Sequence, residues 1–127
     1  MLRAPTWPWC KLNTDGACKR TRASSAGGVI RDHNGVWIFG FGMNIGHCFV
    51  MMVELWGLYQ GLKLAWEHGI KCLVVEIDSL CITQLVNKPV DIINKYTSLI
   101  QSIKEIIQRN WNVIINHVHR EANYIVD

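Results

Sequence analysis

The stretch ELWGLYQGLKLAWEHGIKCLVVEIDS, residues 54–79, decides the fold, because a helical pattern gives way within it to a strand pattern. Small and apolar side chains follow Glu54 at i+3, i+4, i+7, i+8 and i+11, which is the spacing of one helix face. Gly69 is typical of a helix end. The apolar run 72–77 is typical of a central, buried strand. The stretch therefore predicts a helix over residues 50–68 and a buried strand directly after it.

Three strands joined by short connections are predicted before this helix. In residues 10–18, Leu12 and Thr14 alternate with Lys11, Asn13 and Asp15, so the two sets should lie on opposite faces of a strand. A polar, basic loop is predicted over 19–25, a second strand over 26–31 and a third over 36–44. The segment DHNG between the last two is typical of a hairpin turn. Together these segments predict an antiparallel meander.

The chain after the buried strand predicts further helices and one more strand. Either Asp78 or Ser79 could cap a short helix that reaches about Asn87, and Pro89 would end it. A second amphipathic helix is predicted over 92–109 and a last strand over 111–118. Strand–helix–strand connections normally place their strands in parallel. The predicted fold class is α/β, with a mixed five-stranded sheet of three antiparallel strands and then two parallel ones, flanked by helices.

Length and composition predict one globular domain. The chain has 127 residues, 50% of them hydrophobic and 18% charged. Residues 1–8 form a linker-like lead-in, and residues 9–127 the domain. The net charge of +3 is compatible with nucleic acid but does not argue for it. Five cysteines without a close pair indicate reduced thiols, and with no secretory signal or apolar run long enough for a membrane we expect a nuclear or cytoplasmic location without a membrane partner.

Four acidic residues occupy positions that structure alone explains poorly. Glu54 lies on the helix face that must meet the sheet, where an unpaired carboxylate is costly to bury. Asp15 stands inside a strand, which disfavours aspartate. Asp78 ends the most apolar strand, where parallel sheets usually carry functional side chains, and Asp127 follows the last strand. The four could converge at one edge of the sheet.

Such a set of carboxylates predicts a magnesium or manganese site. Ligands that are all oxygen suit Mg²⁺ or Mn²⁺ and not zinc. Two such ions can stabilise the attacking and leaving oxygens of a phosphodiester. Each acid also has a structural alternative: Asp78 as a helix cap, Asp15 at a strand edge or bulge. Glu76 could lie near the site as a spectator, but it is interpreted as strand surface.

Five segments resemble the plant ribonuclease H-like domains of retroelement-derived proteins, which belong to the type 1 ribonuclease H family. The resemblance covers the chain from about residue 9 to its end. It implies a mixed sheet, magnesium and endonucleolytic cleavage of the RNA strand of RNA–DNA hybrids. The family's carboxylates correspond to Asp15, Glu54, Asp78 and Asp127. The segments are KLNTDGA (11–17), GGVIRD (27–32), ELWGLYQGLKLAWEHGI (54–70), VEIDS (75–79) and HVHREAN (117–123).

The same resemblance implies residues that assist the reaction or contact the hybrid. Type 1 enzymes use a mobile basic residue near the last carboxylate, and His117 is favoured for it over His119 and Arg120. Predicted substrate contacts are Asn13, Gly16, Asn123 and Arg120. Affinity is expected to come from backbone contacts, with the 2′-OH marking RNA. The basic loop 19–22 departs from the Gly- and Pro-containing form common in the family.

The end of the chain departs most from the family. The family continues past its last aspartate into a helix, whereas this sequence stops at Asp127. We therefore expect a domain that lacks its C-terminal helix, and a monomer or a part of a longer polypeptide. One alternative is a catalytically impaired remnant that still binds nucleic acid. Another is a structural or interaction domain, in which Glu54 would have no evident use.

The tryptophans have a plain structural interpretation. They could stack on bases. We instead predict that four of them, Trp37, Trp56, Trp66 and Trp111, belong to the core or are half-buried.

Overall fold

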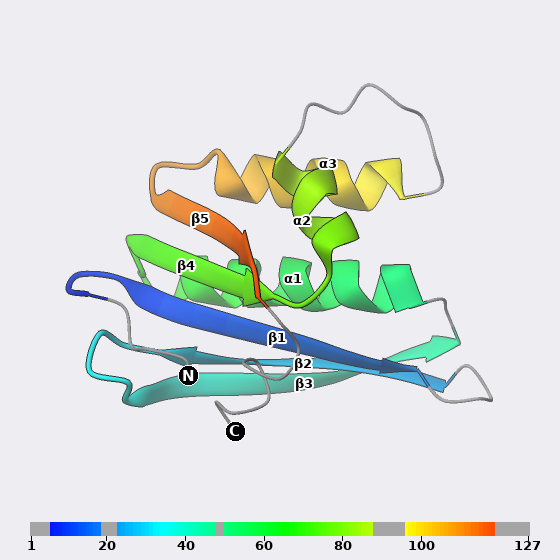
Figure 1. The fold of residues 1–127 in the computed structure, drawn as a ribbon, viewed down its shortest axis with the longest axis horizontal. Coiled ribbons are helices and arrows are strands. Elements are labelled where there is room, and N and C mark those ends of the chain that lie inside the picture. The colour runs from blue at the N-terminus through cyan, green and yellow to red at the C-terminus, as the bar shows by residue number, and fades with distance from the viewer. Residues whose placement is uncertain (1–5, 19–22, 48–49, 88–95, 119–127) are drawn as a thin grey trace.

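The computed structural model describes residues 6–18, 23–47, 50–87 and 96–118, which form one five-stranded sheet with three helices (Figure 1). Strands β1, β2 and β3 pair antiparallel, and β4 and β5 continue the sheet parallel to β1 in the order β3-β2-β1-β4-β5. The predicted mixed sheet is confirmed. The elements are β1 (Cys10–Cys18), β2 (Ala23–Arg31), β3 (Trp37–His47), α1 (Val50–Glu67), β4 (Cys72–Ile77), α2 (Leu80–Asn87), α3 (Thr97–Ile107) and β5 (Asn112–His117).

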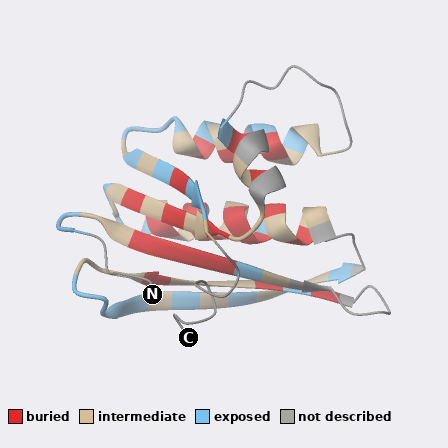
Figure 2. Ribbon diagram, viewed as in Figure 1, coloured by how far each residue is buried: buried red, intermediate tan, exposed pale blue. Residues whose placement is uncertain are grey.

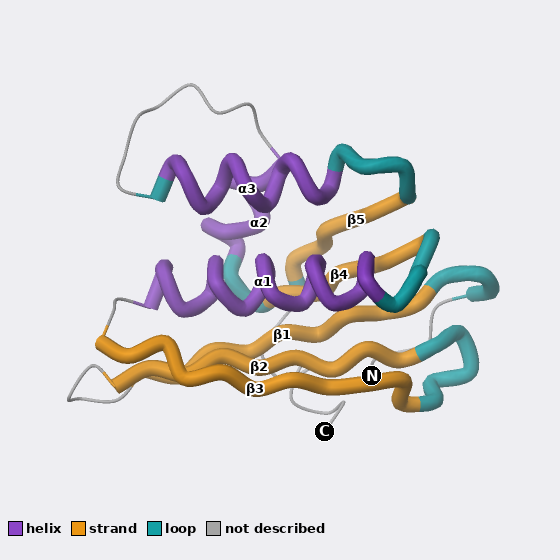
Figure 3. The backbone as a smooth tube through the Cα atoms, turned by 180° about the vertical axis from the view of Figure 1, so that it is seen from behind, coloured by secondary structure: helices purple, strands orange, loops and turns teal. Residues whose placement is uncertain are grey.

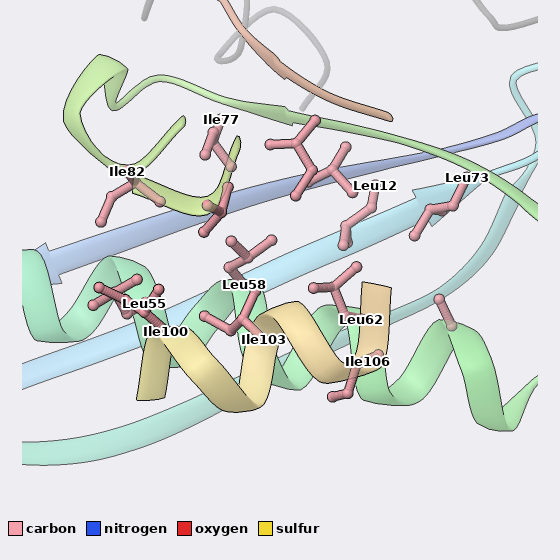
Figure 4. Close-up of a cluster of buried hydrophobic side chains, with 14 of the residues drawn as sticks. Leu12, Leu55, Leu58, Leu62, Leu73, Ile77, Ile82, Ile100, Ile103 and Ile106 are labelled. Atoms are coloured by element: carbon pink, nitrogen blue, oxygen red, sulfur yellow. The ribbon is translucent and has the colours of Figure 1, made fainter. Parts of the chain in front are cut away.

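Helix α1 packs closely on β1 and β2 because its inner face carries glycines, and α3 packs in turn on α1 (Figure 3). A Cβ atom placed on Gly61 would lie 2.7 Å from Cδ2 of Leu12, and one on Gly57 would lie 3.2 Å from Cβ of Ala26. Buried residues occur on the central strands and on the three helices (Figure 2). Figure 4 shows the centre of this core, including Leu12, Leu55, Leu58, Leu62, Leu73, Ile77, Ile100 and Ile103.

Local signals end the elements where the sequence predicts. Gly69 has a φ of +76°, the left-handed conformation that glycine adopts easily after a helix. The turn between β2 and β3 is held by Asp32, whose Oδ1 accepts hydrogen bonds from the backbone N–H groups of Asn34 and Val36. At the start of α2, Oγ of Ser79 accepts a hydrogen bond from the N–H of Ile82 at 3.2 Å. Ser79 is therefore the cap.

Three sequence predictions differ from the structure. Strand β2 begins at Ala23, inside the predicted loop 19–25, because the backbone of 23–25 pairs with β1 or β3 and this pairing outweighs the low strand propensity of serine. Strand β3 extends to His47 instead of residue 44. Trp37 is 58% exposed, because it begins the edge strand beyond the reach of α1, so its assignment to the core was wrong.

Other predictions meet the limits of the described residues. Of the predicted helix 92–109, the described part is α3 from Thr97, while residues 92–95 lie outside. The same holds for residues 1–5 of the lead-in and for residues 119–127. Within the ranges described, none of the helices is long and apolar enough to cross a membrane.

Candidate active site

The side chain of Glu54 reaches from α1 to β1. It is half-buried, one residue after the fully buried Val53. A Cβ atom on Gly16 would lie 3.5 Å from Oε1 of Glu54 and 2.8 Å from Cγ1 of Val53. Because Gly16 carries no side chain, the helix can come this close to the strand. The structure thus places the Glu54 carboxylate directly beside the Asp15–Gly16 peptide, as the sequence predicted for the inner face of the helix.

Asp15 and Asp78 occupy corresponding positions along two neighbouring strands, Asp15 within β1 and Asp78 directly after β4. Asn13 and Glu76 are the last residues that pair between β1 and β4. Asp15 follows Asn13 by two residues, and Asp78 follows Glu76 by two. Side chains two apart point to the same face of a strand, so Asp15 continues the face of Asn13 along β1, whereas Asp78 comes directly after the last residue of β4. Asp15 is exposed, and its Oδ1 accepts a hydrogen bond of 2.9 Å from the N–H of Gly16.

His117 lies beside Asp78. It is the last residue of β5, paired with Ile77, and its Nε2 lies 3.2 Å from the backbone carbonyl oxygen of Asp78. The histidine is exposed to solvent. The structure therefore places the favoured basic residue next to one of the predicted carboxylates.

Glu76 was wrongly interpreted as strand surface. Its Oε2 lies 3.3 Å from Nζ of Lys11, and the two side chains are only 13% and 10% exposed. Its Oε1 accepts a hydrogen bond of 3.2 Å from Nδ2 of Asn13. The sequence carried one signal for this contact. The alternation along β1 puts Lys11 and Asn13 on one face, and such polar side chains need a polar partner on the adjoining strand when they are buried.

The remaining predicted site residues lie outside the described part of the chain. These are Asp127, Asn123, Arg120, the alternative His119 and the basic loop 19–22.

The donor set fits magnesium in its chemistry. Asp15, Glu54 and Asp78 offer only carboxylate oxygens, which Mg²⁺ and Mn²⁺ prefer. The gap at Gly16 lets one of them approach the strand that carries another. Within the described ranges, however, no three His, Cys, Asp or Glu side chains gather closely enough to hold an ion by themselves. A metal here would need a further ligand or a closer approach of these three.

Comparisons with known proteins identify the family of the chain. The model of the family described as "Reverse transcriptase-like" matches residues 13–127. An Arabidopsis thaliana protein, provisionally named a ribonuclease H protein, is 39% identical over 125 residues. That match covers 98% of this chain but 20% of the relative, so the chain spans about a fifth of the relative's length.

Solved structures share the fold. Ribonuclease H1 from the archaeon Halobacterium salinarum superposes with a TM-score of 0.82 at 19% identity, over 91% of this chain and 89% of that one. LC11 ribonuclease H1, solved in complex with an RNA/DNA hybrid, gives a TM-score of 0.76 at 20% identity, over 90% and 88% of the two chains. With the family match, these similarities show that the chain belongs to the reverse transcriptase-like family and has the ribonuclease H-like fold.

Proposed function

We propose that this chain is a metal-dependent ribonuclease that cuts the RNA strand of RNA–DNA hybrids. The observation that carries the proposal is the approach of the Glu54 carboxylate to Gly16, beside Asp15 and level with Asp78. Structure alone gives no reason to place Glu54 on the inner side of α1 against Gly16, with Asp78 directly after the neighbouring strand β4. The Arabidopsis relative's name and the hybrid bound by LC11 ribonuclease H1 support the same substrate.

In this proposal the residues act by holding Mg²⁺ and by placing the phosphodiester. Asp15, Glu54, Asp78 and Asp127 are the proposed ligands. Mg²⁺ in such sites stabilises negative charge on the attacking and leaving oxygens. A water oxygen forms a bond to phosphorus while the bond to the 3′ oxygen breaks, which leaves a 5′ phosphate and a 3′ hydroxyl. His117 is the basic residue beside Asp78 that we expect to assist departure of the product.

The hybrid would be recognised mainly through its backbone. Phosphate contacts carry no sequence information, so cleavage should show little sequence preference. The 2′-OH distinguishes the RNA strand from DNA. Gly16, Asn123 and Arg120 remain the proposed contacts, together with Asn13, whose amide is 3.2 Å from Glu76.

The decisive experiment replaces Glu54 by glutamine in a cleavage assay on a labelled RNA–DNA hybrid. The Glu54→Gln substitution keeps the size of the side chain and removes its charge. We expect Mg²⁺- or Mn²⁺-dependent cutting of the RNA strand by the wild type, abolished by EDTA, and a loss of roughly 10³-fold in the variant. Glu67→Gln, at the exposed end of the same helix, is the matched control and should retain activity. Thermal unfolding verifies that both variants fold.

A second function, a hybrid-binding domain without catalysis, is favoured by one observation. The described carboxylates do not by themselves form a metal-binding group. If the folded wild type binds the hybrid but leaves it uncut with either metal, this second function holds. A folded chain that neither binds nor cuts would instead indicate a structural or interaction domain.

A further inference from the structure

Lys11, Asn13 and Glu76 form a polar network across β1 and β4, which is called the strand clamp below. One carboxylate oxygen of Glu76 meets the Lys11 ammonium at 3.3 Å, and the other accepts the Asn13 amide at 3.2 Å. Lys11 and Asn13 are both buried. Glu76 thus uses both of its carboxylate oxygens to join β4 to β1. It stands 63 residues after Asn13 in the sequence.

The clamp lies at the last paired level of the two strands, immediately before the predicted carboxylates. Asn13 pairs with Glu76. Asp15 follows Asn13 by two residues on the same face of β1, and Asp78 follows Glu76 by two residues, directly after the end of β4. Beyond this level no β1–β4 pairing is present among the described residues to fix their separation. The clamp therefore ties the two strands together just before the two aspartates.

Stability alone is a poor reason for a clamp of this kind. Burying an ion pair costs desolvation that its attraction only partly offsets, and apolar residues of similar size often serve as well. The neighbouring buried positions of β4, Leu73, Val75 and Ile77, are all apolar. Glu76 also adds a carboxylate close to a predicted cation site, where it would attract metal ions itself. The Lys11 ammonium offsets that charge.

We propose that Glu76 is a positioning residue, which acts through Asn13 and Lys11 to hold Asp15 and Asp78 at the separation that a metal ion requires. This inference rests on the proposed function, since it assigns a role toward the same carboxylates. We assign Glu76 to the clamp and not to the metal, since its two oxygens contact the Lys11 ammonium and the Asn13 amide.

A double-mutant cycle between Asn13 and Glu76 tests the clamp, with Mn²⁺ binding to the chain alone measured by calorimetry. Asn13→Ala and Glu76→Ala should each weaken Mn²⁺ binding about tenfold, and the double variant should be no weaker than the worse single variant. Val74→Ala, two residues earlier on the same face of β4, is the matched control. It should lower the melting temperature while Mn²⁺ affinity stays within about twofold.

A second pair of substitutions separates positioning from stability. Lys11→Met with Glu76→Leu removes both charges together, so it should fold as stably as the wild type. Its Mn²⁺ affinity should still be about tenfold weaker than that of the wild type, because the Asn13 amide has then lost the Glu76 carboxylate as its acceptor on β4. Recovery of wild-type affinity in this variant would overturn the role of the clamp.

The remaining outcomes discriminate between the two proposals. Wild-type Mn²⁺ affinity in both folded single variants overturns the positioning role but leaves the proposed ribonuclease intact. If Asn13→Ala raises KM for the hybrid without changing Mn²⁺ affinity, Asn13 contacts substrate and the clamp is again refuted. A wild-type chain that binds no Mn²⁺ overturns both proposals, whereas Mn²⁺ binding and clamp coupling without cleavage overturns the ribonuclease alone.

Discussion

Ser79 and Asp78 are adjacent, and the sequence allows either to cap α2. The structure assigns the cap to Ser79, whose Oγ accepts the N–H of Ile82. Of the two candidates, Ser79 therefore provides an acceptor for the first turn of α2.

Ser79→Ala should destabilise the chain by about 1 kcal/mol, because the first turn of α2 loses the acceptor for one backbone N–H. For a domain of this size that corresponds to a fall of roughly 4 °C in Tm. Thermal unfolding followed by circular dichroism measures it. Ser98→Ala, at an exposed position of α3, is the control and should change Tm by less than about 1 °C. Equal effects of the two substitutions would argue against the cap.

Cys10 is the first residue of β1, and its thiol should make the stability of the fold depend on pH in the alkaline range. Burial raises the pKa of this thiol above its ordinary value of 9.0, and the charges of Asp32 and Cys72 raise it further. The thiol of the unfolded chain therefore ionises first. Its contribution to stability is complete below about pH 9 and is lost as the pH rises through the raised pKa of the folded state.

Urea unfolding at several pH values above about 8 tests this response. The free energy of unfolding of the wild type should decline more steeply with rising pH than that of Cys10→Ala. The comparison isolates Cys10 from lysines and tyrosines that titrate in the same range. Parallel pH profiles for the two chains would contradict the prediction.

Among the elements, the packing of α1 on β1 depends on the absence of a side chain at Gly61. A Cβ atom there would overlap Leu12, which is fully buried and has no room to move. Overpacking of this kind costs about 1–3 kcal/mol, against a gain of about 1 kcal/mol in helix propensity. The overlap should outweigh the propensity.

Gly61→Ala is therefore expected to lower the free energy of unfolding by about 1 kcal/mol, measured by urea denaturation. Gly42→Ala is the control, since a Cβ atom on Gly42 meets nothing within 4 Å. That change should leave stability the same or slightly higher. A Gly61→Ala chain more stable than wild type would mean that α1 can move away from β1 without cost.

The sequence predicts elements well where a periodic pattern is local. The apolar spacing after Glu54 and the run at 72–77 gave α1 and β4 almost to the residue, because both patterns lie within one element. The first residues of β2 were missed because only their pairing with β1 and β3 makes them strand. Glu76 was missed for the same reason, since its partners stand 63 and 65 positions earlier (76 − 13 and 76 − 11).

For the predicted site, too, the sequence reveals what depends on one element and misses what depends on contacts between distant strands. The periodic pattern predicts Glu54 on the helix face that meets the sheet, and in the structure its carboxylate lies near Gly16. Asp15 and Asp78 each follow by two residues the last pair between β1 and β4. The roles of these acids stay predictions, as do those of Asp127, Asn123 and Arg120 outside the described residues. No local pattern could show the Lys11–Glu76 ion pair, because it exists only once two distant strands are neighbours.

At the scale of the whole molecule, the net charge of +3 must suffice for binding a polyanion. Affinity that comes from phosphate contacts falls steeply with salt. If about four phosphates are neutralised, hybrid affinity should fall roughly a hundredfold between about 50 and 200 mM salt. Fluorescence anisotropy with a labelled hybrid, in Ca²⁺ instead of Mg²⁺, measures this.

A scrambled hybrid of equal length is the control for base recognition. Its affinity should agree with that of the first hybrid within about threefold, because backbone contacts are independent of sequence. Affinity that is insensitive to salt, or that depends strongly on sequence, would contradict backbone recognition.

The sheet order also dictates when the site can exist during synthesis. Strands β1, β2 and β3 are neighbours along the chain and can pair as soon as they leave the ribosome, whereas β4 must join β1 across α1 (Figure 1). Asp15 is translated more than sixty residues before Asp78, so a nascent chain has only half of the carboxylate pair for much of its synthesis. Until Asp78 has left the ribosome, the emerging polypeptide therefore cannot bring together Asp15 and Asp78, two of the proposed magnesium ligands.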